Sequence, residues 1–256
     1  MKRKICISAF FVVSLLFCSL VIWEKPLKQV SVIPSGDITI VVDAGHGGVD
    51  GGATAADGTL EKDITLQIAE EFEKILEEFP VNVIMTRSVD TGLYDGTEQT
   101  IRSKKRTDLQ RRREIFNEEG VDLAVSIHLN SFPQDESVYG AQVFYPAQTK
   151  GRTNGQRDEH TAESYAKSVQ KSLEINISDG RERQAMEKND ILIFEDINCP
   201  VILIECGFMS NKKELNRLKT AEYQRVLAKA IWEGINENLC LKKQEKIEVV
   251  DSANRF

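Results

Sequence analysis

Short apolar runs alternate with longer amphipathic stretches along this chain, and that alternation limits the folds it can adopt. The first run, residues 38–42, is β-branched and apolar on both faces, which is typical of a strand buried in a parallel sheet. Apolar side chains then recur at three- and four-residue steps from Ile64 to Phe79, which predicts an amphipathic helix that ends before Pro80. Further strands are predicted at residues 81–86, 122–128, 140–145, 191–194 and 201–204.

The same periodicity predicts the remaining helices. They are expected at residues 107–119, 163–173, 212–218 and 221–238. The polar stretch that continues through Ser103 has no clear period, so we expect it to be a loop. The C-terminal tail, residues 241–256, is charged and thin in core side chains, so we expect it to be loosely attached.

Alternating strands and helices predict an α/β fold, a single domain over residues 38–240 with a mainly parallel twisted sheet flanked by helices. A chain of 256 residues with 41% hydrophobic content is long enough for one sizeable core. The formal charge of −7 gives no reason to expect a nucleic-acid partner. In such folds the carboxyl ends of the strands form the edge that carries functional groups.

The N-terminus is predicted to be a secretory signal peptide or a signal anchor, residues 1–23. Residues 1–4 carry three positive charges, and residues 5–23 contain no charged side chain. The absence of a small-x-small cleavage site favours a retained anchor, and the basic start favours export of everything that follows. We therefore expect an exported domain, joined by a polar linker at residues 24–37, with membrane contact only through the N-terminal segment.

Cysteine usage does not predict a disulfide framework. Two of the five cysteines lie in the apolar N-terminal segment, which leaves Cys199, Cys206 and Cys240 in the domain. Buried thiols are the simpler interpretation, and a single bridge between Cys199 and Cys206 is the alternative outside the cell.

Four side chains stand where an α/β sheet presents catalytic groups. His46 lies in the glycine-rich loop after the first strand, His128 ends the strand at 122–128, and Glu205 directly follows residues 201–204. Glu61 stands at the head of the first helix. Three of these could bind Zn²⁺ as a His2Glu set at the carboxyl ends of the strands, with the fourth position left to water and the last residue as general base.

Each of these residues also has a simpler interpretation. His46 could simply satisfy a turn, and His128 could be a packed core residue. Glu61 could be a first-turn carboxylate that the helix dipole favours. Glu205 could form a salt bridge at the edge of the sheet, although a carboxylate directly after a buried apolar run is costly without a partner. No local His-Glu-x-x-His motif is present, so the site has to be assembled from remote segments.

Several separate blocks, in the right order, resemble the zinc-dependent N-acetylmuramoyl-L-alanine amidases. The blocks are residues 41–48 (Val-Val-Asp-Ala-Gly-His-Gly-Gly), 61–63 (Glu-Lys-Asp), 126–131 (Ser-Ile-His-Leu-Asn-Ser) and 200–211 (Pro-Val-Ile-Leu-Ile-Glu-Cys-Gly-Phe-Met-Ser-Asn). Leu109, Arg112 and Asn117 also fall where such amidases carry a Leu-x-x-Arg and Asn pattern. The similarity extends over about residues 38–239 and departs from the usual pattern at Leu129, Phe116 and Cys206.

The resemblance implies hydrolysis of the amide bond between N-acetylmuramic acid and L-alanine in peptidoglycan. His46, Glu61 and His128 would be the Zn²⁺ ligands, Glu205 the catalytic carboxylate, and Asn130 and Arg112 candidate substrate contacts.

The basic stretch at residues 102–113 holds seven Lys or Arg side chains. It is interpreted either as a solvated helix face or as a contact for carboxylates of the wall peptide.

A short chain with one catalytic domain and no recognisable wall-binding module looks most like the germination-specific amidases that act on spore cortex. That resemblance implies removal of stem peptides toward muramic-lactam formation, a step needed for germination. The missing wall-binding module motivates a further expectation, an exported accessory protein that assists activity. The alternatives are an exported zinc peptidase or deacetylase acting on the cell wall, and a catalytically silent amidase-like protein that binds peptidoglycan.

Overall fold

The computed structural model describes residues 38–147, 161–177, 180 and 182–244. The predicted signal or anchor segment, the linker at 24–37 and residues 245–256 of the tail lie outside the described residues, so those assignments stay predictions. Within the described ranges, no helix has both the length and the apolar character needed to cross a bilayer.

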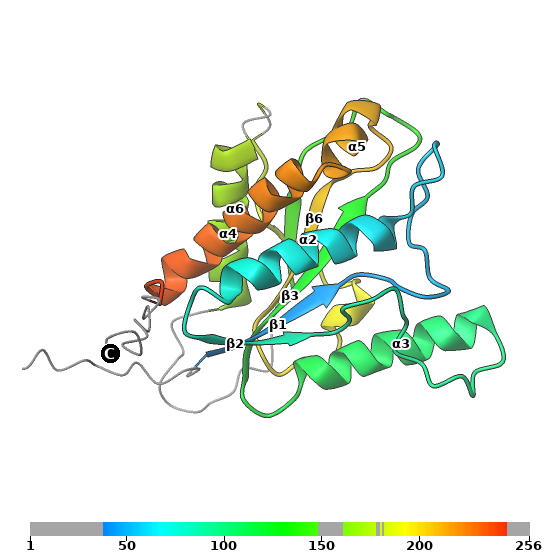
Figure 1. Cartoon of the computed structure of the whole chain (residues 1–256), viewed down its shortest axis with the longest axis horizontal. Helices are drawn as coiled ribbons and strands as arrows, with labels where there is room; N and C mark the ends of the chain where they lie inside the picture. Colours follow the sequence, from blue (N-terminus) through cyan, green and yellow to red (C-terminus); the bar gives the residue numbers. More distant parts are fainter. Residues whose placement is uncertain (1–37, 148–160, 178–179, 181, 245–256) are drawn as a thin grey trace, which may run out of the picture. The chain divides into compact units, whose positions relative to one another are not determined.

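In the described part of the chain, six strands form one sheet in the order β2-β1-β3-β6-β4-β5. The strands are β1 (Ile38–Ala44), β2 (Val81–Met85), β3 (Val121–Asn130), β4 (Gln142–Tyr145), β5 (Met186–Glu187) and β6 (Val201–Phe208). Every pair is parallel except β4 with β6, which is antiparallel. The predicted α/β fold with a mainly parallel sheet is therefore confirmed (Figure 1).

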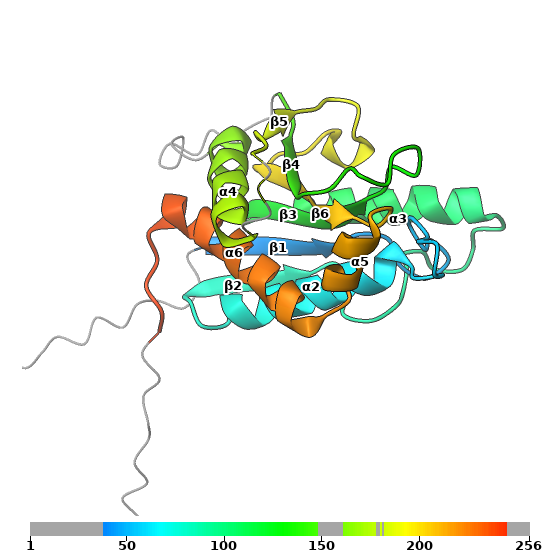
Figure 2. The same cartoon turned by 90° about the horizontal axis from the view of Figure 1, so that it is seen from above.

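Helices cover both faces of this sheet (Figures 1 and 2). They are α2 (Glu61–Leu76), α3 (Ile101–Phe116), α4 (Ala162–Ile177), α5 (Lys212–Leu218) and α6 (Ala221–Leu239). Successive side chains of a strand point to opposite faces, so Ile40 and Val42 pack into the core under α2, α4 and α6. Val41, between them, packs instead with Phe116 of α3. The sheet is thus apolar on both sides, as the continuous apolar runs predicted.

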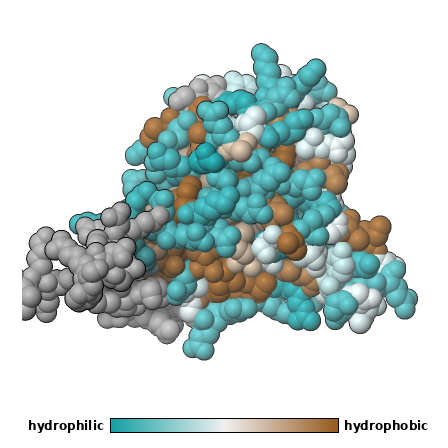
Figure 3. All heavy atoms as spheres, in the orientation of Figure 1, coloured by the Kyte–Doolittle hydropathy of each residue, from teal (hydrophilic) through white to brown (hydrophobic). Residues whose placement is uncertain are grey.

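The outer surfaces of these helices are polar. Figure 3 shows a mostly hydrophilic face for the described residues, with apolar side chains confined to smaller areas. Helix α2 shows the reason, because its apolar positions Ile64, Ile68 and Phe72 are buried. The exposed positions of the helix are polar, namely Asp63, Gln67 and Lys74. Amphipathic spacing therefore located α2 correctly from sequence.

The predicted strand at residues 191–194 is wrong. Residues Leu192–Phe194 form a 3-10 turn, η1, in which the Phe194 amide donates to the Ile191 carbonyl at 3.0 Å. Ile193 and Phe194 are buried in the core next to α3. The run is apolar because it packs under α3, and a short apolar run cannot be distinguished from a strand by period alone.

Helix α3 begins at Ile101, six residues before its predicted start. Thr100 and Ser103 form a reciprocal capping box, in which each side-chain oxygen accepts a hydrogen bond at 3.1 Å from the other residue's backbone N–H. Such a box closes the first helical turn, so the end of the predicted loop is helical. The correction moves Arg102 from the predicted loop onto the helix and adds Lys104 and Lys105, which had no assignment.

The three cysteines in the described part of the chain are free thiols. Cys199 and Cys206 are both buried and unbonded to each other, whereas Cys240 is exposed. Cys199 packs in the core under α3, and Cys206 packs in the core under α2, α4 and α6. The sheet lies between these two cores, which is why no bridge forms.

Candidate metal centre

His46 lies in a tight loop directly after β1. Its backbone adopts a left-handed conformation with φ of 62°, which is uncommon for a residue other than glycine. Gly45 precedes it, and a Cβ atom there would lie 2.4 Å from Cε1 of His128. Only glycine therefore lets the His46 loop approach the ring of His128 so closely.

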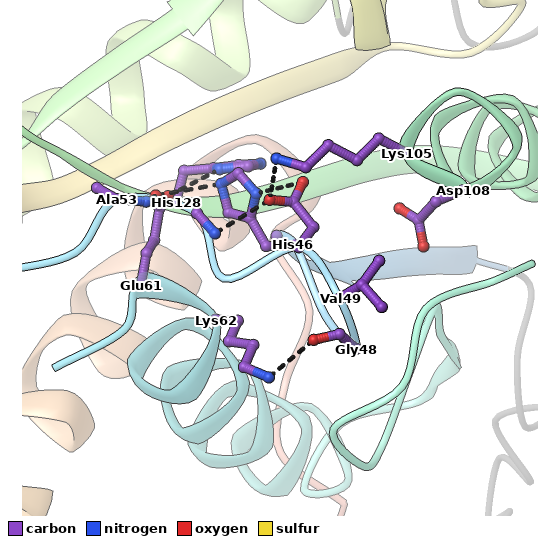
Figure 4. Close-up of polar contacts among 12 residues, drawn as sticks. His46, Gly48, Val49, Ala53, Glu61, Lys62, Lys105, Asp108 and His128 are labelled. Carbon is purple, nitrogen blue, oxygen red and sulfur yellow. Dashed lines mark hydrogen bonds and ion pairs between the residues drawn. The ribbon is translucent and has the colours of Figure 1, made fainter. Parts of the chain in front are cut away.

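The structure brings His46, Glu61 and His128 together (Figure 4). One donor atom from each residue lies within 4.8 Å of the others. Nε2 of His46 is 3.1 Å from Oε2 of Glu61, and Nδ1 of His128 is 3.1 Å from Oε1. The predicted cluster from three remote segments is thus present, and these residues could hold a metal ion.

The Glu61 carboxylate is fixed by the backbone as well as by the histidines. Its Oε2 accepts a hydrogen bond from Ala53 N–H at 2.8 Å, and its Oε1 accepts one from Leu129 N–H at 2.9 Å. Burial opposes ionisation, but the hydrogen bonds with His128 and His46 outweigh it and hold the pKa of Glu61 well below its usual range. The carboxylate is therefore ionised and oriented before any ligand arrives.

Asp50 holds the other nitrogen of His46. Its Oδ2 lies 3.1 Å from His46 Nδ1, and its Oδ1 lies 2.6 Å from Nζ of Lys105 on α3. Burial disfavours a charged imidazole, yet the contacts with Asp50 and Glu61 raise the pKa of His46 to about 9. A carboxylate at Nδ1 leaves Nε2 of His46 directed at the cluster, the arrangement common for metal-binding histidines.

Arg112 is buried behind the His46 loop. Its guanidinium contacts Asp43, Asp108 at 2.7 Å, the Ala44 carbonyl at 2.8 Å and the His46 carbonyl. With its side chain 4% exposed, Arg112 positions the His46 loop through these contacts. Its candidate role as a substrate contact stays a prediction.

Arg87 supports the same loop and was not identified from sequence. Its guanidinium donates to the carbonyls of Ala44 and Gly45, both at 3.0 Å. An arginine directly after the strand predicted at residues 81–86 was the only available signal. Buried arginines that bind loop carbonyls thus support the His46 segment from two sides.

Glu205 lies on β6 and pairs in register with His128 on the neighbouring strand. Residues in register project to the same side of a parallel sheet, so the Glu205 carboxylate lies beside the cluster. Its Oε2 is buried and has no hydrogen-bond partner among the described residues. Burial raises the pKa of Glu205 to about 7, because desolvation disfavours the carboxylate.

Asn130 ends β3 two residues after His128. Its Oδ1 accepts a hydrogen bond from Ser131 N–H at 2.8 Å, and its backbone carbonyl accepts one from Met209 N–H at 2.7 Å. These contacts fix the loop after β3. The candidate role of Asn130 in substrate binding stays a prediction.

The donor set fits zinc. Two imidazoles, one carboxylate and room for a further ligand are the usual surroundings of catalytic Zn²⁺. The buried, unpartnered Oε2 of Glu205 is a second indication, because an acceptor left unpaired costs stability unless something else occupies its surroundings.

Comparison with known proteins gives the family. The N-acetylmuramoyl-L-alanine amidase family matches residues 40–237. The germination-specific N-acetylmuramoyl-L-alanine amidase of Bacillus subtilis (strain 168) is 36% identical over 213 residues, which cover 83% of this chain and 81% of that protein. The amidase AmiA of Escherichia coli (strain K12) is 26% identical over 248 residues, covering 83% and 78%.

A solved structure supports the same assignment. The CwlD amidase from Clostridioides difficile, in complex with the GerS lipoprotein, is 38% identical, with a TM-score of 0.72. The similarity covers 79% of this chain and 98% of that chain. The chain therefore belongs to the N-acetylmuramoyl-L-alanine amidase family and is an enzyme of that class.

Proposed function

We propose that this amidase is a zinc enzyme that hydrolyses the amide bond between the lactyl carbonyl of N-acetylmuramic acid and L-alanine. The observation that carries the proposal is the His46, Glu61 and His128 cluster with the buried, unpartnered Oε2 of Glu205 beside it. A zinc ion held by the three clustered residues would supply a Lewis acid and lower the pKa of water.

Glu205 carries the proton transfers in this proposal. Its carboxylate accepts a proton from the attacking water and then donates it to the nitrogen of L-alanine as the carbon–nitrogen bond breaks. A pKa near 7 suits both halves of the task, since the group can be deprotonated before attack and protonated afterwards. The products are a free lactyl carboxylate on the glycan and a peptide with a free amino terminus.

The other residues position these groups. Asp50 fixes the tautomer of His46, while Arg112 and Arg87 hold the backbone that carries it. The two backbone N–H groups that bind Glu61 keep its carboxylate between the imidazoles. Preorganised groups of this kind lower the reorganisation needed during reaction.

The test is to incubate the purified chain with peptidoglycan, with zinc or with a chelator, and to identify products by mass spectrometry. We expect zinc-dependent release of peptides that begin with L-alanine from intact glycan. Peptides cut elsewhere would identify a zinc peptidase, and loss of acetyl groups a deacetylase. Binding without products from a folded, zinc-loaded chain would identify an amidase-like binding protein.

We propose spore cortex as the substrate, where removal of stem peptides would lead toward muramic lactam. The similarity to a germination-specific amidase supports this, since 81% of that protein is covered. The test compares initial rates on cortex and vegetative peptidoglycan. Faster cleavage of vegetative wall would contradict the cortex assignment and leave the amidase reaction intact.

We also propose export, with an accessory protein that assists activity at the wall. The N-terminal apolar segment supports export, and the CwlD amidase structure in complex with the GerS lipoprotein supports a partner. A chain that holds zinc tightly by itself and cleaves its wall at full rate would contradict the need for a partner. Fractionation of cells between cytosol and envelope tests the export.

A further inference from the structure

A groove of about 800 Å³ runs from the histidine cluster along α3. His46 and His128 line one part of it, and basic side chains of α3 line another. Ile191 and Leu192, next to η1, also line the groove, and Leu192 is 58% exposed. Ligand-binding pockets commonly enclose about 300–1,000 Å³, so this groove is large enough for part of a substrate.

Most charged side chains in the groove already have partners. The pairs are Lys105 with Asp50 at 2.6 Å, Arg113 with Glu195 at 2.9 Å, and Arg112 with Asp43 and Asp108. Arg102 and Arg106 differ, because they are exposed and have no ion pair or hydrogen bond with the described residues. Two guanidinium groups are therefore available to an anionic ligand.

These two arginines lie on one face of α3. Residues 102, 106, 109 and 113 follow one another at three- and four-residue steps, which places them in a row along the helix. The eleven steps from residue 102 to residue 113, at a rise of 1.5 Å each, extend for roughly 16 Å. An extended peptide at about 3.3 Å per residue covers that length with about five residues.

The composition of the groove favours a peptide over a phosphate-rich polymer. Guanidinium groups recognise carboxylates through paired N–H donors, and the exposed Leu192 side chain offers apolar contact to methyl groups. Stem peptides combine free carboxylates with alanine methyl groups. A polyphosphate chain would gain nothing from the apolar side of the groove.

We infer that the stem peptide lies in this groove and that Arg102 and Arg106 recognise its free carboxylates. The inference rests on the proposed function, because it assumes that the amide to be cleaved sits at the His46 cluster. Arg102 and Arg106 would then determine substrate specificity, and the basic residues at 102–113 would have two different roles. Arg112 positions the loop, whereas Arg102 and Arg106 bind substrate.

The kinetic test compares two muropeptides, one with free stem carboxylates and one with those carboxylates amidated. In the full zinc-loaded chain, Arg102→Gln with Arg106→Gln should lower kcat/KM on the free-carboxylate substrate about tenfold. The same double variant should cleave the amidated substrate within about twofold of the parent rate, because neutral amides make much weaker contacts with guanidinium groups.

The matched control removes two charges from the same helix outside the groove. Lys104→Gln with Arg111→Gln should leave kcat/KM on both substrates within about twofold of the parent, since neither side chain lines the groove. Equal losses in the control, or equal losses on both substrates, would overturn the inference.

A binding measurement separates this inference from the proposed reaction. Calorimetric titration of the Glu205→Gln chain with each muropeptide should show about tenfold tighter binding of the free-carboxylate form, and the Arg102 and Arg106 substitutions should abolish that preference. If the parent chain were inactive while the Glu205→Gln chain showed this preference, only the proposed amidase reaction would be contradicted. No preference in the Glu205→Gln chain would overturn the groove assignment whatever the parent cleaves.

Discussion

Asp50 and His46 form a pair that fixes which nitrogen of the histidine faces the metal cluster, with Asp50 Oδ2 3.1 Å from Nδ1. Asp50→Asn removes the charge from this contact, so at a pH above the His46 pKa of about 9 we expect zinc affinity to fall about tenfold, a usual effect for a residue behind a ligand. Competition with a chromophoric chelator measures it. Asp57→Asn is the control, because Asp57 pairs with Lys219 at 2.7 Å outside the cluster, and an equal loss there would refute the positioning role.

Zinc binding should weaken as the pH falls. Contacts with Asp50 and Glu61 raise the pKa of His46 to about 9 despite its burial, so the metal-free chain holds a proton that zinc must displace. Apparent affinity should drop by about tenfold for each pH unit below 9, to the extent that His46 alone titrates. Chelator competition across that range measures the slope. In the Asp50→Asn variant, the fall in zinc affinity should begin at a lower pH. An unchanged pH profile would contradict the conclusion that Asp50 raises the pKa of His46.

Glu205→Gln should leave zinc bound while turnover falls by a factor of about 10² to 10⁴, the usual contribution of a positioned acid or base. The amide is nearly the same size but cannot accept the proton. Zinc content by atomic absorption, together with single-turnover rates on peptidoglycan, gives the two readouts. A fully active variant would exclude Glu205 as the proton carrier.

The same substitution should stabilise the metal-free chain at high pH. Burial raises the pKa of Glu205 to about 7 from the ordinary 4.5, so the folded state binds this proton more strongly than the unfolded state. Stability is therefore lost as the pH rises from the unfolded to the folded pKa, and Glu205→Gln avoids that loss. We expect a gain on the order of 3 kcal/mol in unfolding free energy at pH 8 and none at pH 4, measured with urea. A gain that does not depend on pH would contradict this cause.

The sequence was sufficient to place the cluster because a parallel sheet brings the carboxyl ends of its strands to one edge. Glu205 directly follows a buried apolar run, His128 ends another, and His46 lies in the loop after a third, so their proximity followed from topology. Glu61 was weaker on pattern alone, since first-turn carboxylates are common on helices. The structure adds that two backbone N–H groups donate hydrogen bonds to Glu61. Such contacts cannot be inferred from the spacing of residues in the sequence.

What the sequence did not predict depends on contacts between distant residues. Arg112 lies 69 positions from Asp43, and only the folded chain shows that the guanidinium is buried against this carboxylate. The η1 segment was misassigned because burial under α3 and burial in a sheet select the same apolar residues. The start of α3 carried a local signal in Thr100 and Ser103, which was overlooked within a polar stretch.

Arg112→Gln provides the most direct test of how the loop is held. It leaves the Asp43 and Asp108 carboxylates buried without their guanidinium, and breaking a buried ion pair commonly costs about 3–5 kcal/mol. Urea unfolding of the metal-free chain measures the loss. Because the guanidinium also holds the Ala44 and His46 carbonyls, zinc affinity should fall at temperatures where the variant is still folded.

The control is Arg111→Gln, which breaks only an exposed pair with Glu114. It should cost less than about 1 kcal/mol and leave zinc affinity unchanged. If the two variants proved equally stable, Arg112 would not be the residue that holds the His46 loop in place.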